Sequence, residues 1–341
     1  MNTLTAPAHA QEGQRAFRLA SVVLGYGIAP IMCVLIVAFL AWTEPRFFSR
    51  LNLMNVSRNF SLLSLAATGQ ALVMIAGGFD MSVGAAMALA SIVQVSTMVW
   101  FTAHFPAQPA VMVCAAGVVA AALSGALLGL TNALIVTHLK VVPFMTTLAV
   151  TYVVVGGLLY YTKGVPLYGV PDGFTDFIGR GTLLSIPVIT WIGLIVIGLV
   201  SVALTYSRTG RHIYAVGGHA PAARASGVAV ERTLVICYVL SALCAALAGV
   251  LWTARLGTGE SALGGNTAIE SIAAAVLGGV SLRGGQGGIW RVTVAALFLT
   301  LVSNALNLLQ IDSKWQTFVL GVAVIVAVFV ELLARKESRD E

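Results

Sequence analysis

The chain has 341 residues, of which 58% are apolar and 9% are charged, and its formal net charge is +6. A soluble domain carries about 25% charged residues, so this composition, with its recurring apolar runs of about 20 residues, excludes a soluble globular protein and predicts an all-α polytopic membrane protein. Lysine and arginine in cytoplasmic loops account for the positive charge, and because no basic tract carries interleaved aromatic residues, no nucleic-acid partner is expected.

About ten membrane-spanning helices are expected in a single transmembrane domain at residues 19–334. The polar residues 1–18 and the charged residues 335–341 are expected to form cytoplasmic tails. Pro30 is expected to kink the first span. The spans are expected at residues 19–42, 60–76, 82–101, 109–136, 142–161, 183–206, 233–253, 268–280, 289–309 and 315–333.

The connections between the spans differ in character. Residues 43–58 form a polar link, residues 162–181 contain glycines and prolines that favour turns over a regular helix, and residues 207–232 form the longest charged loop. In the fourth span, Gly125 and Gly129 form a Gly-x-x-x-Gly pair that permits close contact with another helix. Twelve of the 19 Lys and Arg residues fall on the side of the two tails, which predicts that both termini are cytoplasmic.

A charged turn follows the second span. Residues 77–84 read Gly-Gly-Phe-Asp-Met-Ser-Val-Gly and contain Asp80, the only acidic residue between Glu44 and Asp172. Glycine lets the backbone turn, and Asp and Ser accept hydrogen bonds from the free N–H groups at the start of a helix. Asp80 is therefore either an N-cap for the span that starts at Ser82 or a contact for a solute or ion within the membrane.

A weak echo of this turn occurs late in the chain. Ala76-Gly77-Gly78 and Leu277-Gly278-Gly279 each end a span and precede a serine and more glycine. Internal repeats are common in transporters, so the echo is either a true repeat or a chance match in a glycine-rich chain.

The charged loop contains the signals of a very short helix. Pro221 suits a first helical turn, the alanines around it favour helix, and Gly227 suits a left-handed stop. A free helix of two turns is marginally stable in water, so this one is expected to dock against something. The loop is either an ordinary cytoplasmic connection with positive-inside arginines or a helix that inserts into the groove of a partner.

Residues 77–84 resemble the Gly-Gly-Ile-Asp-Leu-Ser-Val-Gly signature of the permease subunits of ribose-type ABC sugar importers. Further stretches resemble the same family in the same order, and together they cover most of residues 45–335. They are residues 210–227, the glycine-rich residues 272–287, residues 304–316, and the shorter matches at Asn132, Pro143-Phe144 and Thr147-Leu148. The chain departs from the family where Phe79 and Met81 replace Ile and Leu, and where His219 replaces an Asn, the better N-cap.

The resemblance implies an ATP-driven importer that moves a monosaccharide or similar small polar solute across the bacterial inner membrane. It implies three partners: a second permease subunit, a tandem-domain ATPase on the cytoplasmic face and a periplasmic sugar-binding protein on the outer face. ATP and Mg would bind the ATPase, and no cofactor would bind this chain. The short loop helix would be the coupling helix, which moves with ATP-driven closure.

Three sets of residues are the candidates for function. The ATPase-coupling loop consists of Arg211, Ala220, Pro221, Ala222, Ala223, Arg224 and Gly227. The signature turn consists of Gly77, Gly78, Asp80, Ser82 and Gly84. The candidates for a translocation pathway are Gln70, Asn132, Phe144, Thr147, Glu270 and Asn304. Polar residues within spans more often bond between helices than bind a solute, and Glu270 either pairs with Arg255 or faces an outer cavity.

No signature of an enzyme occurs in the chain. It has no Walker A lysine motif, no His-Glu-x-x-His and no Gly-x-Ser-x-Gly, and its five histidines and four cysteines lack the spacing of metal ligands. No metal site is therefore expected, and ATP hydrolysis must come from a partner. The alternative function is an ion-coupled secondary transporter that uses Asp80, although such proteins usually carry more ionisable groups within their spans.

Overall fold

The computed structural model describes residues 29–311 and, beyond them, only residues 315, 318, 321–322, 325 and 329. The expected tails, the start of the first span and most of the last span lie outside the described residues. The described chain is almost entirely helical. Its elements are α2 (Ala29–Thr43), η1 (Pro45–Phe48), α3 (Arg50–Ile75), α4 (Val83–His104), α5 (Ala110–Thr137), α6 (Pro143–Thr162), α7 (Asp172–Phe174), η2 (Thr175–Arg180), β1 (Thr182–Leu183), β2 (Ile186–Pro187), α8 (Val188–Tyr206), α9 (Arg208–Ala225), α10 (Val230–Leu256), α11 (Thr267–Leu277) and α12 (Ile289–Leu308).

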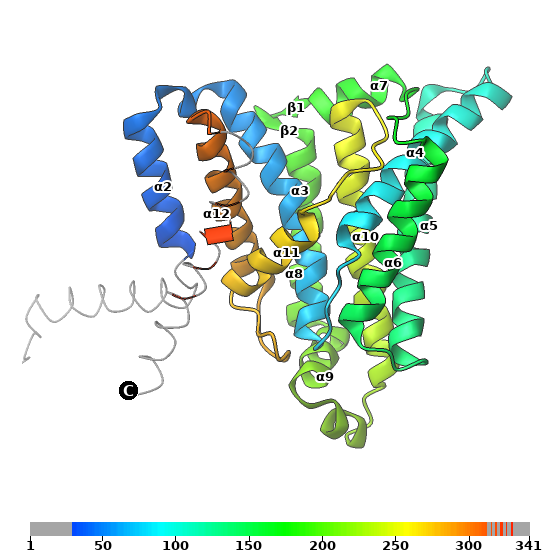
Figure 1. The fold of residues 1–341 in the computed structure, drawn as a ribbon, viewed down its shortest axis with the longest axis vertical. Helices are drawn as coiled ribbons and strands as arrows, with labels where there is room; N and C mark the ends of the chain where they lie inside the picture. The colour runs from blue at the N-terminus through cyan, green and yellow to red at the C-terminus, as the bar shows by residue number, and fades with distance from the viewer. Residues whose placement is uncertain are drawn as a thin grey trace, which may run out of the picture.

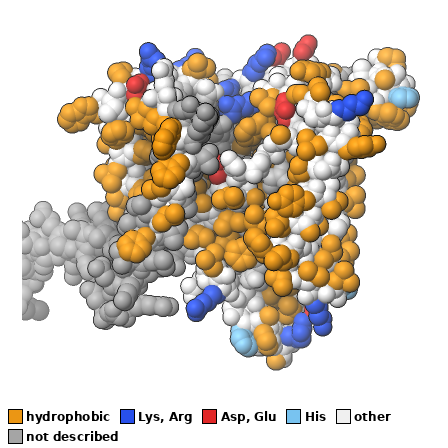
Figure 2. Space-filling model, in the orientation of Figure 1, with side chains coloured by type: hydrophobic (Ala, Val, Ile, Leu, Met, Phe, Trp, Pro, Cys, Tyr) orange, Lys and Arg blue, Asp and Glu red, His pale blue; other side chains and the backbone are white. Residues whose placement is uncertain are grey.

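The all-α membrane fold is confirmed. Six described helices, α4, α5, α6, α8, α10 and α12, are long and apolar enough to cross a membrane, and α2 and α11 are shorter apolar helices. Each of the nine spans expected before residue 310 corresponds to a helix. In Figure 2, charged side chains gather at the two ends of the bundle and hydrophobic side chains cover the surface between them, as a lipid environment requires.

Helix α3 is the central helix and packs against α8, α10, α11 and α12 (Figure 1). From Ser61 to Ile75 nearly every residue is buried, including the polar residues Ser61, Ser64, Thr68 and Gln70. A helix that is surrounded by protein can carry more polar residues than one that faces lipid, because neighbouring helices can hydrogen-bond them. This explains why α3, although long and largely buried, is not among the six helices that are apolar enough to cross a membrane.

Small residues allow the central helices to approach one another. A Cβ atom on Gly129 would lie 2.6 Å from the carbonyl oxygen of Tyr238, and one on Gly125 would lie 2.6 Å from the Cβ of Ala246. The expected close contact of the Gly-x-x-x-Gly pair is therefore confirmed, and its partner is α10. The same type of contact joins α10 to α4, since a Cβ on Gly249 would lie 2.2 Å from the carbonyl oxygen of Met87.

Two sequence-based expectations about the connections were wrong. The expected polar link to residue 58 is helical from Arg50, because Ser49 Oγ accepts the N–H of Asn52 at the helix start and Asn52 then pairs with Asn304 of α12. The loop at residues 162–181 contains α7 and η2. Pro30 is the second described residue of α2, and the part of the first span before Ala29 lies outside the described residues, so the expected kink stays a prediction.

Two helices begin inside the bundle instead of at its ends. After α3 the chain turns back, and α4 starts part of the way up; after α10 the chain descends, and α11 starts at a similar depth (Figure 1). The two returning segments touch, because a Cβ on Gly84 would lie 2.1 Å from the carbonyl oxygen of Gly264. Backbone of this kind is tolerated at membrane depth where protein surrounds it or where it lines a cavity.

Candidate functional site

The turn after α3 has a left-handed stop. Gly77 has φ +86°, and the N–H of Gly78 reaches back to the carbonyl of Val73 at 2.9 Å. The end of α11 repeats this geometry, with Gly279 at φ +79° and the N–H of Val280 bonded to the carbonyl of Ala275 at 2.9 Å. The two helices therefore end in the same way, but Gly77 matches Gly279, which is one residue away from the sequence echo that paired Gly77 with Gly278.

Asp80 is fully buried and holds three hydrogen bonds. Its Oδ1 accepts the backbone N–H of Ser82 at 2.9 Å and the hydroxyl of Ser82 at 2.6 Å. Its Oδ2 accepts the hydroxyl of Ser241 on α10 at 2.9 Å. The amide of Asn132 on α5 donates to the same Ser82 hydroxyl at 2.7 Å. The carboxylate thus closes the turn and ties it to two neighbouring helices, while the residue at the cap position of α4 is Ser82 itself.

Helices α6 and α10 hold the backbone of the turn. The N–H of Met81 donates to Thr147 Oγ1 at 2.9 Å, and the hydroxyl of Thr151 donates to the carbonyl of Met81 at 3.1 Å. The hydroxyl of Tyr238 donates to the carbonyl of Phe79 at 3.3 Å. Because side chains of α6 and α10 hydrogen-bond the backbone of the signature turn, the turn is a fixed connection between α3 and α4.

Glycines from three segments meet at the α9 end of the bundle. A Cβ on Gly217 of α9 would lie 1.7 Å from the carbonyl oxygen of Ile75, and that oxygen also accepts the N–H of Gly285 at 2.8 Å. A Cβ on Gly284, which has φ +84°, would lie 2.9 Å from the Cα of Gly77. We call Gly77, Gly217, Gly284 and Gly285 the glycine joint. Because its contacts are between backbones, a displacement of α9 would be passed directly to the end of α3 and to the loop before α12.

A tyrosine adds a further bond to the joint. The hydroxyl of Tyr214 on α9 donates to the carbonyl of Gly287 at 2.8 Å. Burial raises the pKa of Tyr214, and the nearby positive charge of Arg291 acts in the opposite direction. The phenol is therefore neutral at physiological pH and remains a hydrogen-bond donor.

The C-terminal part of α9, with the two residues that follow it, forms a separate arm, residues 219–227. The sequence predicted a short helix that starts near residue 220, but the helix begins at Arg208 and is interrupted at His219, whose φ is −159° and ψ is 92°. His219 caps the second part, since its Nδ1 accepts the N–H of Ala222 at 3.1 Å. The arm ends at Gly227, with φ +84°. The expected weak cap is thus present, and the arm is a pre-formed helical unit.

The arm is attached through one buried alanine. Ala223 packs with Val216 and Val230, and Arg224 forms an exposed ion pair with Glu231. Ala222 and Pro221 are exposed. The surface that a partner can reach on the arm is therefore the side of Pro221 and Ala222, and Ala223 belongs to the attachment instead.

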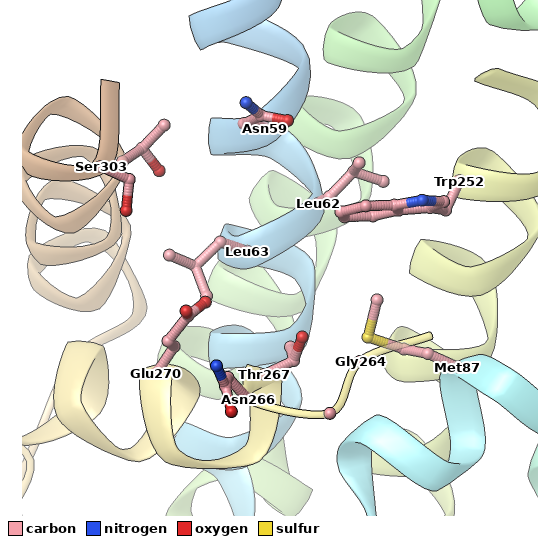
Figure 3. A pocket seen from close by; sticks show the side chains of 12 residues that line it. Asn59, Leu62, Leu63, Met87, Trp252, Gly264, Asn266, Thr267, Glu270 and Ser303 are labelled. Atoms are coloured by element: carbon pink, nitrogen blue, oxygen red, sulfur yellow. The ribbon is translucent and has the colours of Figure 1, made fainter. Parts of the chain in front are cut away.

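A cavity of about 310 Å³ lies in the half of the bundle away from α9, between α3, α4, α10, α11 and α12. Figure 3 shows the side chains of Glu270, Asn266 and Thr267 from the first turn of α11, with the indole of Trp252 across from them. Its lining residues are Asn59, Leu62, Leu63, Met87, Trp252, Gly264, Gly265, Asn266, Thr267, Glu270, Thr300 and Ser303. Polar groups on one wall and an aromatic face on another are what a small hydroxylated ligand requires.

The position of Glu270 decides between the two sequence interpretations. Neither of the two ion pairs within the described part of the chain involves Glu270. Arg255 instead donates to the side-chain oxygen of Asn59. Glu270 therefore faces the cavity, and Arg255 stabilises the position of Asn59, another residue of the cavity lining.

The structure separates the remaining candidates for a translocation pathway. Asn132 and Thr147 bond within the signature turn, and Asn304 bonds to Asn52. Phe144 is exposed on α6, and Gln70 is fully buried, with an amide that has no hydrogen-bond partner among the described residues. Of the six candidates only Glu270 lines the cavity, so the other five do not form one site with it.

Sequence reasoning missed several residues that the structure brings together. Four residues that line the cavity were not selected as candidates: Asn59, Trp252, Asn266 and Ser303. Ser241, which binds Asp80, was also missed. A polar residue inside an apolar run was the available signal for Ser241 and Ser303, but the sequence alone does not say which such residues share a wall.

The fold and these sites together define a class of protein. Three features are typical of a transport permease: apolar helices that can span a membrane, two helices that start within the bundle, and an exposed arm on a helix, α9, whose backbone contacts the end of α3. No catalytic constellation accompanies them in the part of the chain that was described, and no group of three metal-ligating side chains was found there.

The chain belongs to the family of ABC importer permeases described as the branched-chain amino acid transport system / permease component, which matches residues 52–328. It is 35% identical over 308 residues to the ribose import permease protein RbsC of Escherichia coli K12, covering 88% of this chain and 92% of that protein. It is 37% identical over 317 residues to RbsC of Bacillus subtilis 168, covering 92% and 93%. Its identity to the galactose/methyl galactoside import permease protein MglC of Salmonella typhimurium LT2 is 33% over 323 residues, covering 91% and 95%. No solved structure matches the chain.

Proposed function

We propose that this chain is the membrane permease of an ATP-driven importer for a monosaccharide or a similar small, neutral polyol. The names of its relatives as ribose and galactose import permeases support the solute class. The observation that carries the mechanism is the backbone contact between Gly217 of α9 and the end of α3. Through that contact, a force on the exposed arm reaches both α3 and the loop that follows α11.

The importer in this proposal has three further components. Two permease subunits, identical or paralogous, form the pathway; a tandem-domain ATPase that binds ATP and Mg docks on the arm; and a periplasmic sugar-binding protein docks on the opposite face. This chain binds no cofactor of its own. The α9 end and both termini face the cytoplasm of a bacterium, because twelve of the 19 Lys and Arg residues fall on that side.

Transport driven by an ion gradient through Asp80 is the weaker alternative. Asp80 is fully buried, and its two oxygens already accept three hydrogen bonds from Ser82 and Ser241, so an ion would have to enter a closed network. The contacts support a structural role for Asp80.

The two energy sources can be distinguished by uptake measurements. Cells that express the importer should take up D-ribose or D-galactose in a reaction that vanadate abolishes and that proton uncouplers leave intact while ATP is maintained. Loss of uptake with uncouplers under the same conditions, and insensitivity to vanadate, would show that an ion gradient drives the protein.

The docking role of the arm predicts the effect of Ala222→Glu. A carboxylate at this exposed position does not disturb folding, since acidic residues are favourable in the first turn of a helix, but it places a charge on the proposed contact surface. We expect ATPase copurification and uptake to fall roughly tenfold or more, as for a charge buried in an interface. Ala107→Glu, which adds the same charge to an exposed loop at the other end of the bundle, should behave as wild type. Normal ATPase binding by Ala222→Glu would refute the docking assignment.

A further inference from the structure

The cavity beside α11 has the composition of a site for a neutral, hydroxylated ring. None of its twelve lining residues is Lys or Arg, and Glu270 is its single charged group. An anionic solute, such as a sugar phosphate or a free carboxylate, would meet Glu270 with no positive charge on the lining to offset the repulsion. A neutral polyol avoids this penalty and can donate two hydroxyl protons to one carboxylate.

The arrangement of the walls fits such a ring from both sides. In Figure 3 the carboxylate of Glu270 projects upward from α11, Asn266 and Thr267 lie in the same first turn, and Ser303 faces them from α12. The indole of Trp252 lies on the opposite wall beside Leu62 and Met87. The C–H face of a sugar ring can pack on the indole while its hydroxyl groups point to the polar wall.

The polar wall is available for a ligand. The cap position of α11, Asn266, makes no side-chain hydrogen bond to the helix, so its amide can turn to the cavity. Two arginines are close in sequence to lining residues, and both are engaged: Arg255 donates to the side chain of Asn59 and Arg58 donates to the carbonyl of Arg180. Glu270 has no ion pair among the described residues. A volume of about 310 Å³ is at the lower end of the roughly 300–1,000 Å³ found for small-molecule sites, which suits one monosaccharide.

We propose that this cavity is a monosaccharide-binding station within the permease subunit, in which Glu270 and Asn266 bond the hydroxyl groups and Trp252 packs on the ring. The station rests on the proposed import function, since it assumes that a sugar enters the bundle. It lies where α11 starts, and the other end of α11 leads into the glycine joint. A movement of the arm therefore reaches the station through α11.

Uptake by the reconstituted importer, with its ATPase and binding protein, tests the station. Glu270→Gln and Trp252→Leu should each lower the maximal rate of D-ribose or D-galactose uptake roughly tenfold or more, the effect of losing a hydrogen bond to a charged group or an aromatic contact in a closed site. The sugar concentration for half-maximal uptake should stay within about twofold of wild type, because the binding protein determines it. The stimulation of ATPase activity by the binding protein should also stay within about twofold, because it depends on the arm.

Matched controls and a second measurement make the outcome decisive. Asp176→Asn and Trp100→Leu remove an exposed carboxylate and an exposed indole outside the cavity, and both should transport as wild type.

If the cavity variants fail to assemble, the Ser303→Cys variant provides the test. After the labelling of the native cysteines is subtracted, excess D-ribose or D-galactose should slow the labelling of this variant by a maleimide several-fold. The labelling of the Ala107→Cys variant should not change when the sugar is added.

Two results would overturn the proposal, and they are distinguishable. The station would be rejected, and the import function left intact, if Glu270→Gln and Trp252→Leu both took up sugar within twofold of the wild-type rate. Where those variants do not assemble, the same conclusion would follow if sugar did not protect Ser303→Cys from labelling. Absence of ATP-driven uptake of either sugar by the wild-type importer would reject the import function and the station with it.

Discussion

Replacing Gly217 with alanine should separate α9 from the end of α3 and abolish uptake. The new Cβ would lie 1.7 Å from the carbonyl oxygen of Ile75 and 2.6 Å from the backbone nitrogen of Gly285. Both neighbours are backbone atoms, so no side-chain rotation can relieve the overlap. The hydrogen bond between Gly285 and Ile75, 2.8 Å long, would have to break, and the cost should reach or exceed the upper end of the roughly 1–3 kcal/mol typical of overpacking.

The adjacent glycine supplies the control for this prediction. A Cβ on Gly218 would meet no atom within 4 Å, so Gly218→Ala should insert, bind the ATPase and transport as wild type does. The measurements are ATPase copurification, uptake, and protease sensitivity of residues 208–232 in membranes. If Gly217→Ala and Gly218→Ala gave equal uptake, the glycine joint would have no part in transmitting the movement of the arm.

Removal of the Asp80 side chain should have the second large effect. Asp80→Ala leaves the backbone N–H of Ser82 and the hydroxyls of Ser82 and Ser241 without their acceptor in a fully buried site. Each unsatisfied buried group costs roughly 1–3 kcal/mol, so the variant should lose its native elution profile in detergent at much lower temperatures than wild type.

Asp80→Asn distinguishes a structural acid from a functional one. The asparagine oxygen can keep both bonds from Ser82, and its amide can donate to the hydroxyl of Ser241, which also accepts. This variant should therefore remain folded and keep most of its transport. Complete loss of uptake by a stable Asp80→Asn protein would instead assign the negative charge a direct role in moving an ion or solute.

The positions of the spans were predictable because the bilayer imposes a local rule. Any run of apolar residues long enough to cross the membrane forms a helix, whatever its neighbours are. The prediction failed at the start of α3, where polar residues indicated a link that extended to residue 58. Asn52 is satisfied by Asn304, which is 252 residues away in the chain, so only the packed structure reveals why the helix continues.

The turn and the arm were also recognisable from the chain, because glycine and proline act on their own backbone. Gly77 and Gly227 have the left-handed conformations that their positions predicted, and the resemblance of residues 77–84 to a permease signature led to the correct family. The sequence did not show that α9 continues before His219, or that Ala223 points inward, since both depend on contacts with Val216 and Val230.

The sequence by itself determined that this protein is a polytopic membrane protein, because hydropathy and local backbone preferences act over short distances, and its resemblance to a permease signature indicated the family. The tertiary structure alone decided what the polar residues do. It placed Asp80 in a closed network, joined Gly217 to Ile75, and brought Glu270 and Trp252 to facing walls of one cavity. Each of these roles depends on helices that are distant in the chain and adjacent in the bundle.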